Sequence, residues 1–305
     1  SDIKSIVELA HSHNMMVLAD EAHGTHLYFN ENLPMSAMEA GADMAAVSMH
    51  KSGGSLTQSS ILLLGENVNP RYVEQIINLT QTTSASYLLL SSLDISRRNL
   101  ALRGRESFEK VKNMAEYARS EINSIGGYYA YGKELVNKTS IYDYDVTKLS
   151  VYTRDIGLTG IEVYDLLRDE YDIQIEFGDI GNILAYISIG DRMQDIERLV
   201  GALEDIKRLY SKPTSKLHNA EYITPIVAAT PQKAFYADKE LVPIKETAGR
   251  ICGEFVMCYP PGIPILAPGE MITKEIIDYT LYAKEKGCSM QGPEDGTLEK
   301  LNVLK

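Results

Sequence analysis

The stretch MMVLADEAHGTH, residues 15–26, is the part of the sequence that says most about the fold. Its first five residues are all apolar and run into Asp20, a pattern typical of a buried strand in a parallel sheet. Just before it, apolar residues between Ile3 and Ala10 recur at helical spacing, so an amphipathic helix precedes the strand.

The same alternation of helices and strands continues downstream. MSAMEAG (35–41) predicts a short helix that ends at Gly41, while MAAVS (44–48) and SSILLLG (59–65) predict two further short buried strands. Pro70 stands at the first turn of a further predicted helix. Strands that alternate with helices indicate an α/β layer fold with a parallel sheet.

The middle of the chain predicts a second α/β unit. Residues 85–125 are helical and charged in pattern, and Gly126–Gly127 should stop the one or two long helices that they form. Beyond them we expect strands at 148–153, 172–177 and 183–189, and helices at 160–170 and 193–210.

A polar segment, 211–222, reads as a linker to a last block, 230–305. Thr230–Pro231 is a helix-start signal. The run YPPGIPILAPGE (259–270) contains four prolines and therefore cannot be a helix or a central strand.

Composition limits the classes of function. The chain has 305 residues and a formal net charge of −12, which argues against a general nucleic-acid binder and suits a cationic small substrate. There is no apolar run long enough for a membrane helix and no signal peptide. The three cysteines form no CxxC pair, so we expect a reducing, cytoplasmic compartment.

Two motifs carry the chemistry. Asp20 ends the first predicted strand, and Ser48, His50 and Lys51 end the next one in AVSMHKSGGSLTQSS (46–60). Ligands of open α/β sheets bind at the carboxyl ends of strands, so Asp20 and Lys51 are expected to face one crevice. A lysine can form a Schiff base with pyridoxal phosphate, and a carboxylate beside the pyridinium nitrogen keeps that ring protonated.

Simpler interpretations compete with this one. Asp20 is also in position to cap a helix near Ala22, and a lysine in a Gly/Ser turn is often a solvated surface residue. His23 with His26, or His11 with His13, suggests a metal pair, but no HExxH spacing supports it, and we expect no metal. The sequence contains neither a GxGxxG nor a GxSxG motif, which argues against dinucleotide and hydrolase sites.

Taken together, DEAHG (20–24), SMHKSGGSLTQSS (48–60) and YPPGIPILAPGE (259–270) resemble the Orn/Lys/Arg decarboxylase family. The resemblance implies a pyridoxal-phosphate enzyme with the aspartate-aminotransferase fold (fold type I). It also implies a partial large domain over 1–105, a small α/β domain over 106–212 and a C-terminal decarboxylase domain over 220–305.

The resemblance assigns a role to each matching residue. Lys51 would bind the cofactor covalently, Asp20 would pair with the pyridine nitrogen, and Ala22 would lie under the ring. His23 would act near the reacting end of the substrate. Ser48 and His50 would hold the phosphate and orient the lysine. Glu254 is explained at least as well as an interdomain packing residue, and Tyr259 as a tyrosine at the end of a strand.

The reaction implied is decarboxylation of a basic amino acid, arginine before lysine or ornithine, to agmatine or a diamine of polyamine biosynthesis. The family carries a further stretch before residue 1, so the chain resembles a fragment. Uncovered sheet edges should then favour a homodimer or larger homo-oligomer with the active site at the subunit interface. Another reaction on the same scaffold, such as an aminotransferase or lyase, and an inactive partner of a full-length enzyme remain alternatives.

Overall fold

The computed structural model describes residues 1–213, 223–259 and 262–305, and the chain divides into two compact units. The first unit comprises Ser1–Glu121, Tyr131–Leu149 and Tyr186–Val200. The second comprises Ile122–Ala130, Ser150–Ala185 and Gly201–Lys305. The three-part division expected from the sequence, at 105/106 and 212/220, stays a prediction. No helix within the described ranges is long and apolar enough to cross a membrane.

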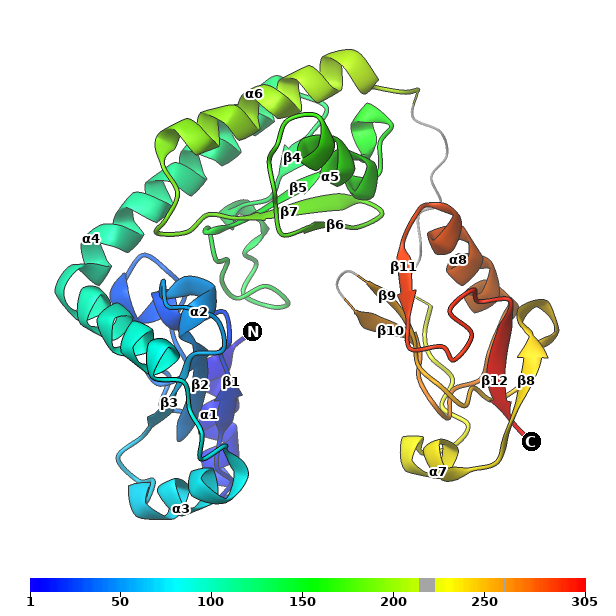
Figure 1. Cartoon of the computed structure of the whole chain (residues 1–305), viewed down its shortest axis with the longest axis horizontal. Helices are drawn as coiled ribbons and strands as arrows, with labels where there is room; N and C mark the ends of the chain where they lie inside the picture. The colour runs from blue at the N-terminus through cyan, green and yellow to red at the C-terminus, as the bar shows by residue number, and fades with distance from the viewer. Residues whose placement is uncertain (214–222, 260–261) are drawn as a thin grey trace. The chain divides into compact units, whose positions relative to one another are not determined.

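The first unit is built on a three-stranded sheet of β1 (Leu18–Asp20), β2 (Met44–Ser48) and β3 (Ser60–Leu64), drawn in shades of blue in Figure 1. All three strands were predicted, and β1 pairs with β2 in parallel, as expected. The prediction of a wholly parallel sheet is wrong, because β3 pairs with β2 antiparallel. The reason is that the connection 49–59 contains only the four-residue helix α2, too short to run back along the strands as the crossover of a parallel pair must.

The expected burial of the first strand is also wrong. Leu18 in β1 is 64% exposed, and Met15 and Met16 just before it are 62% and 55% exposed. β1 lies at the edge of the sheet, with a partner strand on one side only. An apolar run signals that a segment is suited to burial, but within the described chain no strand flanks the outer edge of β1.

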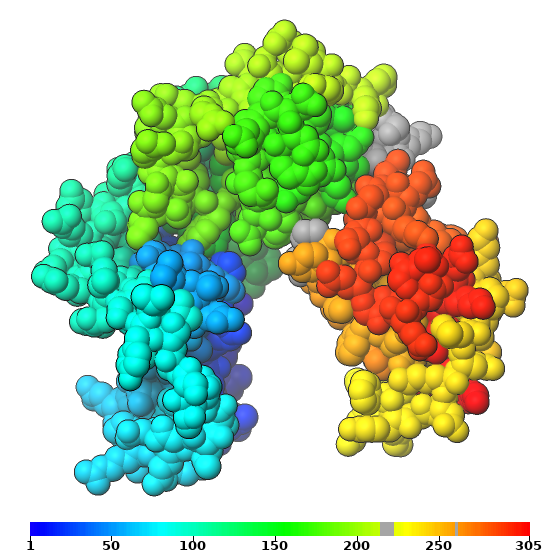
Figure 2. Space-filling model, viewed as in Figure 1, coloured from blue at the N-terminus to red at the C-terminus, as the bar shows by residue number. Residues whose placement is uncertain are grey.

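The helices of the first unit agree with the sequence pattern, with one exception. The amphipathic start is α1 (Ile3–Ser12), and Val7 from it packs with buried alanines beneath the sheet. Pro70 opens α3 (Pro70–Thr80), which buries no residue and contributes to the surface seen in cyan in Figure 2. The helix predicted at 35–41 is wrong: the segment forms turns that end at Gly41, with φ +94°. The Ala40 N–H bonds to the Ser36 carbonyl as in a helix, but the next N–H, that of Gly41, bonds to Met38 instead, so the segment makes one turn and stops.

One long helix links the two units. The region predicted as one or two helices is a single helix, α4 (Tyr87–Ile125). Gly126 and Gly127 end it with φ of +70° and +77°, a conformation that glycine adopts without strain. A short helix, α2 (Met49–Ser52), and a 3₁₀ turn, η1 (Thr25–Phe29), complete the described frame around the sheet.

A four-stranded sheet in the order β4-β5-β7-β6 follows α4. Its strands are β4 (Tyr129–Ala130), β5 (Lys148–Tyr152), β6 (Phe177–Gly178) and β7 (Asn182–Tyr186). Its helices are α5 (Gly160–Asp169) and α6 (Met193–Tyr210), both as predicted, with the 3₁₀ turns η2 (Lys133–Leu135) and η3 (Arg154–Ile156) between strands. The strand expected at 172–177 is largely wrong. Only its last residue is paired, because β6 forms a two-residue ladder with β7.

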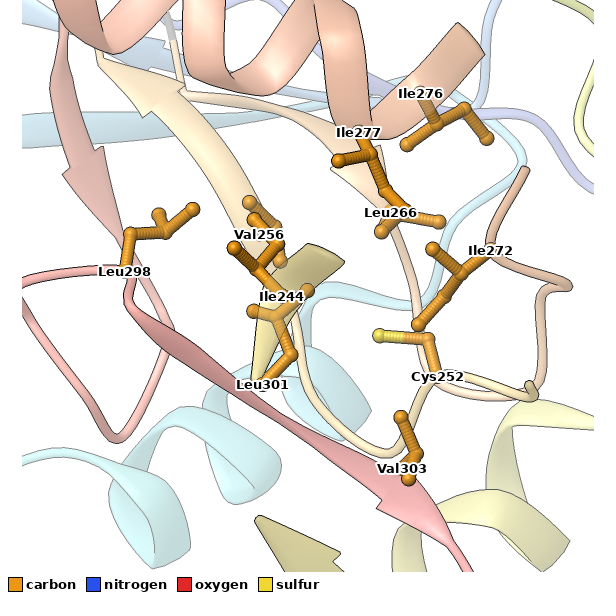
Figure 3. Close-up of a cluster of buried hydrophobic side chains, with 10 residues drawn as sticks. All are labelled: Ile244, Cys252, Val256, Leu266, Ile272, Ile276, Ile277, Leu298, Leu301 and Val303. Carbon is orange, nitrogen blue, oxygen red and sulfur yellow. The ribbon is translucent and has the colours of Figure 1, made fainter. Parts of the chain in front are cut away.

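The described part of the last block forms two small sheets, β10-β9-β11 and β12-β8. Their strands are β8 (Lys239–Pro243), β9 (Val256–Tyr259), β10 (Ile263–Leu266), β11 (Ser289–Gln291) and β12 (Lys300–Leu304). The helices are α7 (Pro231–Tyr236), capped by Thr230 as predicted, and α8 (Lys274–Glu285), with the 3₁₀ turn η4 (Ile244–Glu246). Figure 3 shows the buried apolar side chains that converge between these elements, including Val256, Leu266, Ile277 and Leu301.

The proline-rich run agrees with its sequence reading where it is described. β10, which contains Pro264, is an edge strand with an irregular register between Pro264 and Leu266. Pro260 and Pro261 lie outside the described residues, as does most of the linker expected at 211–222.

Candidate active site

In the sheet of the first unit, the two motifs that carry the chemistry lie at the carboxyl ends of two neighbouring strands. Asp20 is the last residue of β1 and lies opposite Ala46 of β2. β2 ends at Ser48, and α2, which contains Lys51, begins at the next residue. Because β1 and β2 are parallel neighbours, Asp20 and Lys51 follow strand ends at the same edge of the sheet.

The central contact of the site joins Lys51 to His23. The Lys51 Nζ lies 3.3 Å from the His23 Nε2, and both side chains are exposed. An amine and an imidazole at this distance can pass a proton between them or to a third group. The structure therefore brings together the two residues that the sequence marked as catalytic.

Asp20 is engaged by its own turn. Its Oδ1 accepts a hydrogen bond from the backbone N–H of Ala22 at 3.0 Å, which forms an Asx turn. The alternative expectation of a helix cap is wrong, because in the described structure no helix starts near Ala22: the 3₁₀ turn η1 begins at Thr25, and its N-cap is Gly24. The rest of its carboxylate is exposed at the sheet edge, and Ala22 beside it is half-buried. The turn thus exposes the Asp20 carboxylate, and the side chain of Ala22 beside it is a single methyl group.

Glu21 holds this turn in shape. It accepts hydrogen bonds from the Tyr28 hydroxyl at 2.5 Å and from the Ala37 backbone N–H at 2.7 Å. Burial, together with the Glu21 carboxylate, raises the pKa of Tyr28 above its ordinary value, so the hydroxyl stays a donor. A Cβ on Gly24 would come within 2.9 Å of Glu21, which explains a glycine at this position.

The residues that flank Lys51 are fixed through the backbone. The His50 Nδ1 and its backbone N–H lie 3.0 and 3.3 Å from the Ser59 carbonyl oxygen. The Ser48 carbonyl accepts a hydrogen bond from the Thr25 hydroxyl at 3.2 Å. Ser48 and His50 are half-buried. Their hydrogen bonds join the end of β2 to Thr25 and to Ser59.

A buried pair that sequence reasoning missed lies behind His23. The His26 side chain is 1% exposed, and its Nε2 lies 2.8 Å from the Asp145 Oδ2. The Thr147 hydroxyl donates to the other Asp145 oxygen at 2.7 Å. Burial, the largest effect, raises the pKa of Asp145, but the hydrogen bond from His26 and the charges of His26 and Lys148 outweigh it and lower the pKa to about 2.

The same group of residues reaches His23. The Lys148 Nζ lies 3.7 Å from Asp145 and 3.4 Å from the centroid of the Tyr186 ring. The Tyr186 ring in turn meets the His23 ring edge-on, with centroids 6.3 Å apart and planes at 74°. All of these residues belong to the first unit.

No local pattern marks these residues. His26 and Asp145 are 119 positions apart, and the sequence offered His26 only as half of a metal pair. The strands that carry Lys148 and Tyr186 were predicted at 148–153 and 183–189, but their contact with the DEAHG turn was not.

The two further candidates, Glu254 and Tyr259, belong to the second unit. Glu254 accepts hydrogen bonds from the Asn302 backbone N–H at 2.7 Å and the Glu294 backbone N–H at 2.9 Å. Both partners belong to the same last block as Glu254, so the interdomain packing role stays a prediction. Tyr259 ends β9 opposite Ser289 and is 48% exposed.

Comparison with known proteins adds a family to this geometry. The model of the Orn/Lys/Arg decarboxylase major domain matches residues 1–195, and that of the C-terminal domain matches residues 212–294. Proteins named arginine decarboxylase from Bacillus subtilis and Bacillus anthracis are 47% and 45% identical to the chain. Each alignment covers 100% of this chain and 63% of the relative, so the chain spans less than two thirds of their length.

Solved structures confirm the predicted fold class, the aspartate-aminotransferase-like α/β fold. The lysine decarboxylase LdcF of Francisella novicida superposes with a TM-score of 0.76 at 20% identity, over 94% of this chain and 53% of that one. Lysine decarboxylase A from Pseudomonas aeruginosa gives a TM-score of 0.74 at 18% identity, over 100% of this chain and 55% of that one. At these identities the likeness concerns the fold alone.

Proposed function

The chain belongs to the Orn/Lys/Arg decarboxylase family, and from this premise we propose that it carries the lysine-bearing part of a pyridoxal-phosphate-dependent decarboxylase acting on arginine. The observation that carries the proposal is the Lys51 Nζ at 3.3 Å from the His23 Nε2, on the sheet edge that also presents Asp20. The names of the relatives at 45–47% identity support arginine, and lysine or ornithine are the alternatives within the family.

The side chains at this edge fit pyridoxal phosphate chemically. Lys51 offers an exposed amine for its aldehyde, and Asp20 offers an exposed carboxylate for its ring nitrogen. Ala22 would lie under the ring, and Ser48 and His50 would hold the phosphate. When bound, pyridoxal phosphate supplies an electron sink for the bond broken at the α-carbon.

The residues of the chain do the rest of the work. Asp20 would keep the proton on the ring nitrogen, because a carboxylate beside that nitrogen favours its charged form. His23 and Lys51, within proton-transfer distance of each other, would deliver a proton to the substrate α-carbon after carbon dioxide leaves. His50, anchored on the Ser59 carbonyl, would fix the start of α2 and thereby the origin of the Lys51 side chain.

We also propose that the site is completed by association, in a homodimer or larger homo-oligomer. The three site residues Asp20, His23 and Lys51 are exposed, and so are the apolar side chains of Leu18 in β1 and Met16 just before it. Apolar surface beside a polar site is typical of an interface. Sedimentation of the purified chain tests this, and a monomer at all concentrations would contradict it.

A second candidate is another reaction on the same scaffold, such as that of an aminotransferase. It would use the same Asp20 and Lys51 but would not need the run at 259–270. The match of residues 212–294 to the decarboxylase C-terminal domain favours decarboxylation.

The experiment is to add pyridoxal phosphate, reduce with borohydride and map the labelled peptide. We expect a visible absorbance band and label on Lys51, with both lost in Lys51→Ala and retained in the control Lys110→Ala, an exposed lysine on α4. Release of carbon dioxide from arginine, lysine and ornithine then identifies the substrate. Label scattered over surface lysines, or full turnover by Lys51→Ala, would overturn the assignment.

A further inference from the structure

The imidazole of His23 is exposed, yet its proposed work requires one orientation. An exposed histidine samples several rotamers about its two side-chain torsions unless something blocks them. The described ring contact of His23 is the edge-on contact with Tyr186, at 6.3 Å between centroids. Such contacts fix the relative orientation of two rings as well as their distance.

Tyr186 is itself held in place. The Lys148 ammonium lies 3.4 Å from the centroid of its ring, a close cation–π contact, and also 3.7 Å from the Asp145 carboxylate. Asp145 is bound to His26, which is 1% exposed and only three residues after His23. The chain of contacts therefore starts and ends on the same turn and closes on itself.

We propose that Tyr186, held by Lys148, is a positioning residue that keeps the His23 imidazole directed at Lys51. This inference rests on the proposed function, because it assigns the role through which His23 serves Lys51. The contacts of Tyr186 with His23 and with Lys148 are both made by its ring. Misplacing a reacting group by ~1 Å can cost about 10²-fold in rate. Loss of the Tyr186 ring should therefore lower kcat far more than it raises KM.

The test compares Tyr186→Leu, which removes the ring, with Tyr186→Phe, which keeps it. Lys148→Met is a second variant that removes the ammonium against the ring and leaves residue 186 a tyrosine. Tyr117→Leu, at an exposed tyrosine on α4, is the matched control. Circular dichroism of each variant establishes that it folds.

The first readout needs neither cofactor nor turnover. The six histidines of the chain give few imidazole signals in a ¹H–¹⁵N spectrum, and His23→Gln identifies the one from His23. We expect cross-relaxation between the His23 and Tyr186 ring protons in the wild type and in Tyr186→Phe. In Tyr186→Leu and Lys148→Met the His23 signal should move toward that of a freely rotating histidine, and in Tyr117→Leu it should not move.

The second readout is steady-state kinetics of the chain with pyridoxal phosphate. We expect kcat to fall about 10–10²-fold in Tyr186→Leu, with KM changed less than about threefold, and to recover in Tyr186→Phe. An unchanged His23 signal in folded Tyr186→Leu overturns the inference, as does a Tyr186→Phe variant as impaired as Tyr186→Leu. Failure of the proposed function looks different, because Lys51 would then remain unlabelled in the wild type.

Discussion

Replacing Asp145 by asparagine tests whether the buried pair with His26 stabilises the first unit. The His26 side chain is 1% exposed and that of Asp145 is 22% exposed, so solvent screens their contact little. Asparagine has nearly the same shape but no charge. The substitution therefore removes the electrostatic part of the contact and leaves the packing in place.

The pKa of Asp145 gives the magnitude. Burial favours the neutral carboxyl, but His26 and Lys148 together hold the Asp145 pKa at about 2, against 3.8 for an unperturbed carboxyl. The difference corresponds to about 2 kcal/mol of folding free energy at neutral pH. Because the folded pKa is depressed, this stabilisation is fully present above the unfolded pKa of about 4 and is lost as the pH falls through about 2.

The assay is urea unfolding followed by circular dichroism, at neutral pH and in acid. We expect Asp145→Asn to lose about 2 kcal/mol at neutral pH and to converge with the wild type near pH ~2. The control is Asp94→Asn, which breaks an exposed pair with Arg97 and should cost under about 1 kcal/mol. Equal stability of Asp145→Asn and the wild type at neutral pH, or a difference that persists unchanged in acid, would refute the reasoning.

Two further predictions concern the second unit. The Cys288 thiol donates to the Cys258 sulfur and lowers the pKa of Cys258, whereas burial raises the pKa of Cys252 to about 11. Iodoacetamide should therefore alkylate Cys258 well before Cys252, as followed by mass spectrometry, and equal rates would contradict this. Thr159 and Glu162 form a capping box at the start of α5, so Thr159→Ala should lower the free energy of unfolding by about 1 kcal/mol in urea titrations. An unchanged midpoint would show that the cap contributes nothing.

The elements that the sequence predicted best are those whose signal is local. β2 has the bounds read from MAAVS, and α4 ends at the glycine pair that was expected to stop it. The errors arise where the outcome depends on partners. The antiparallel direction of β3 follows from the short connection 49–59, and the exposure of Leu18 follows from the position of β1 at the sheet edge.

The candidate site shows the same division. Asp20, His23 and Lys51 were found because each lies in a motif that follows a predicted strand, and the parallel pairing of β1 with β2 brings those motifs together. Asp145 and Tyr186 could not be found in this way. They lie in distant segments with no motif of their own, and only the fold brings them to the turn at His23.

This division has a physical reason. A side chain that must meet a cofactor and a substrate has to be accessible, and His23 and Lys51 are both exposed. An exposed side chain has fewer packing contacts to fix its orientation, and for His23 the edge-on contact with the Tyr186 ring supplies one. His26, three residues after His23, is almost wholly buried and binds Asp145. Asp145 in turn contacts Lys148, which packs on the Tyr186 ring. For this reason the reactive residues His23 and Lys51 lie in recognisable motifs, whereas the residues that support them, Asp145 and Tyr186, lie in segments without one.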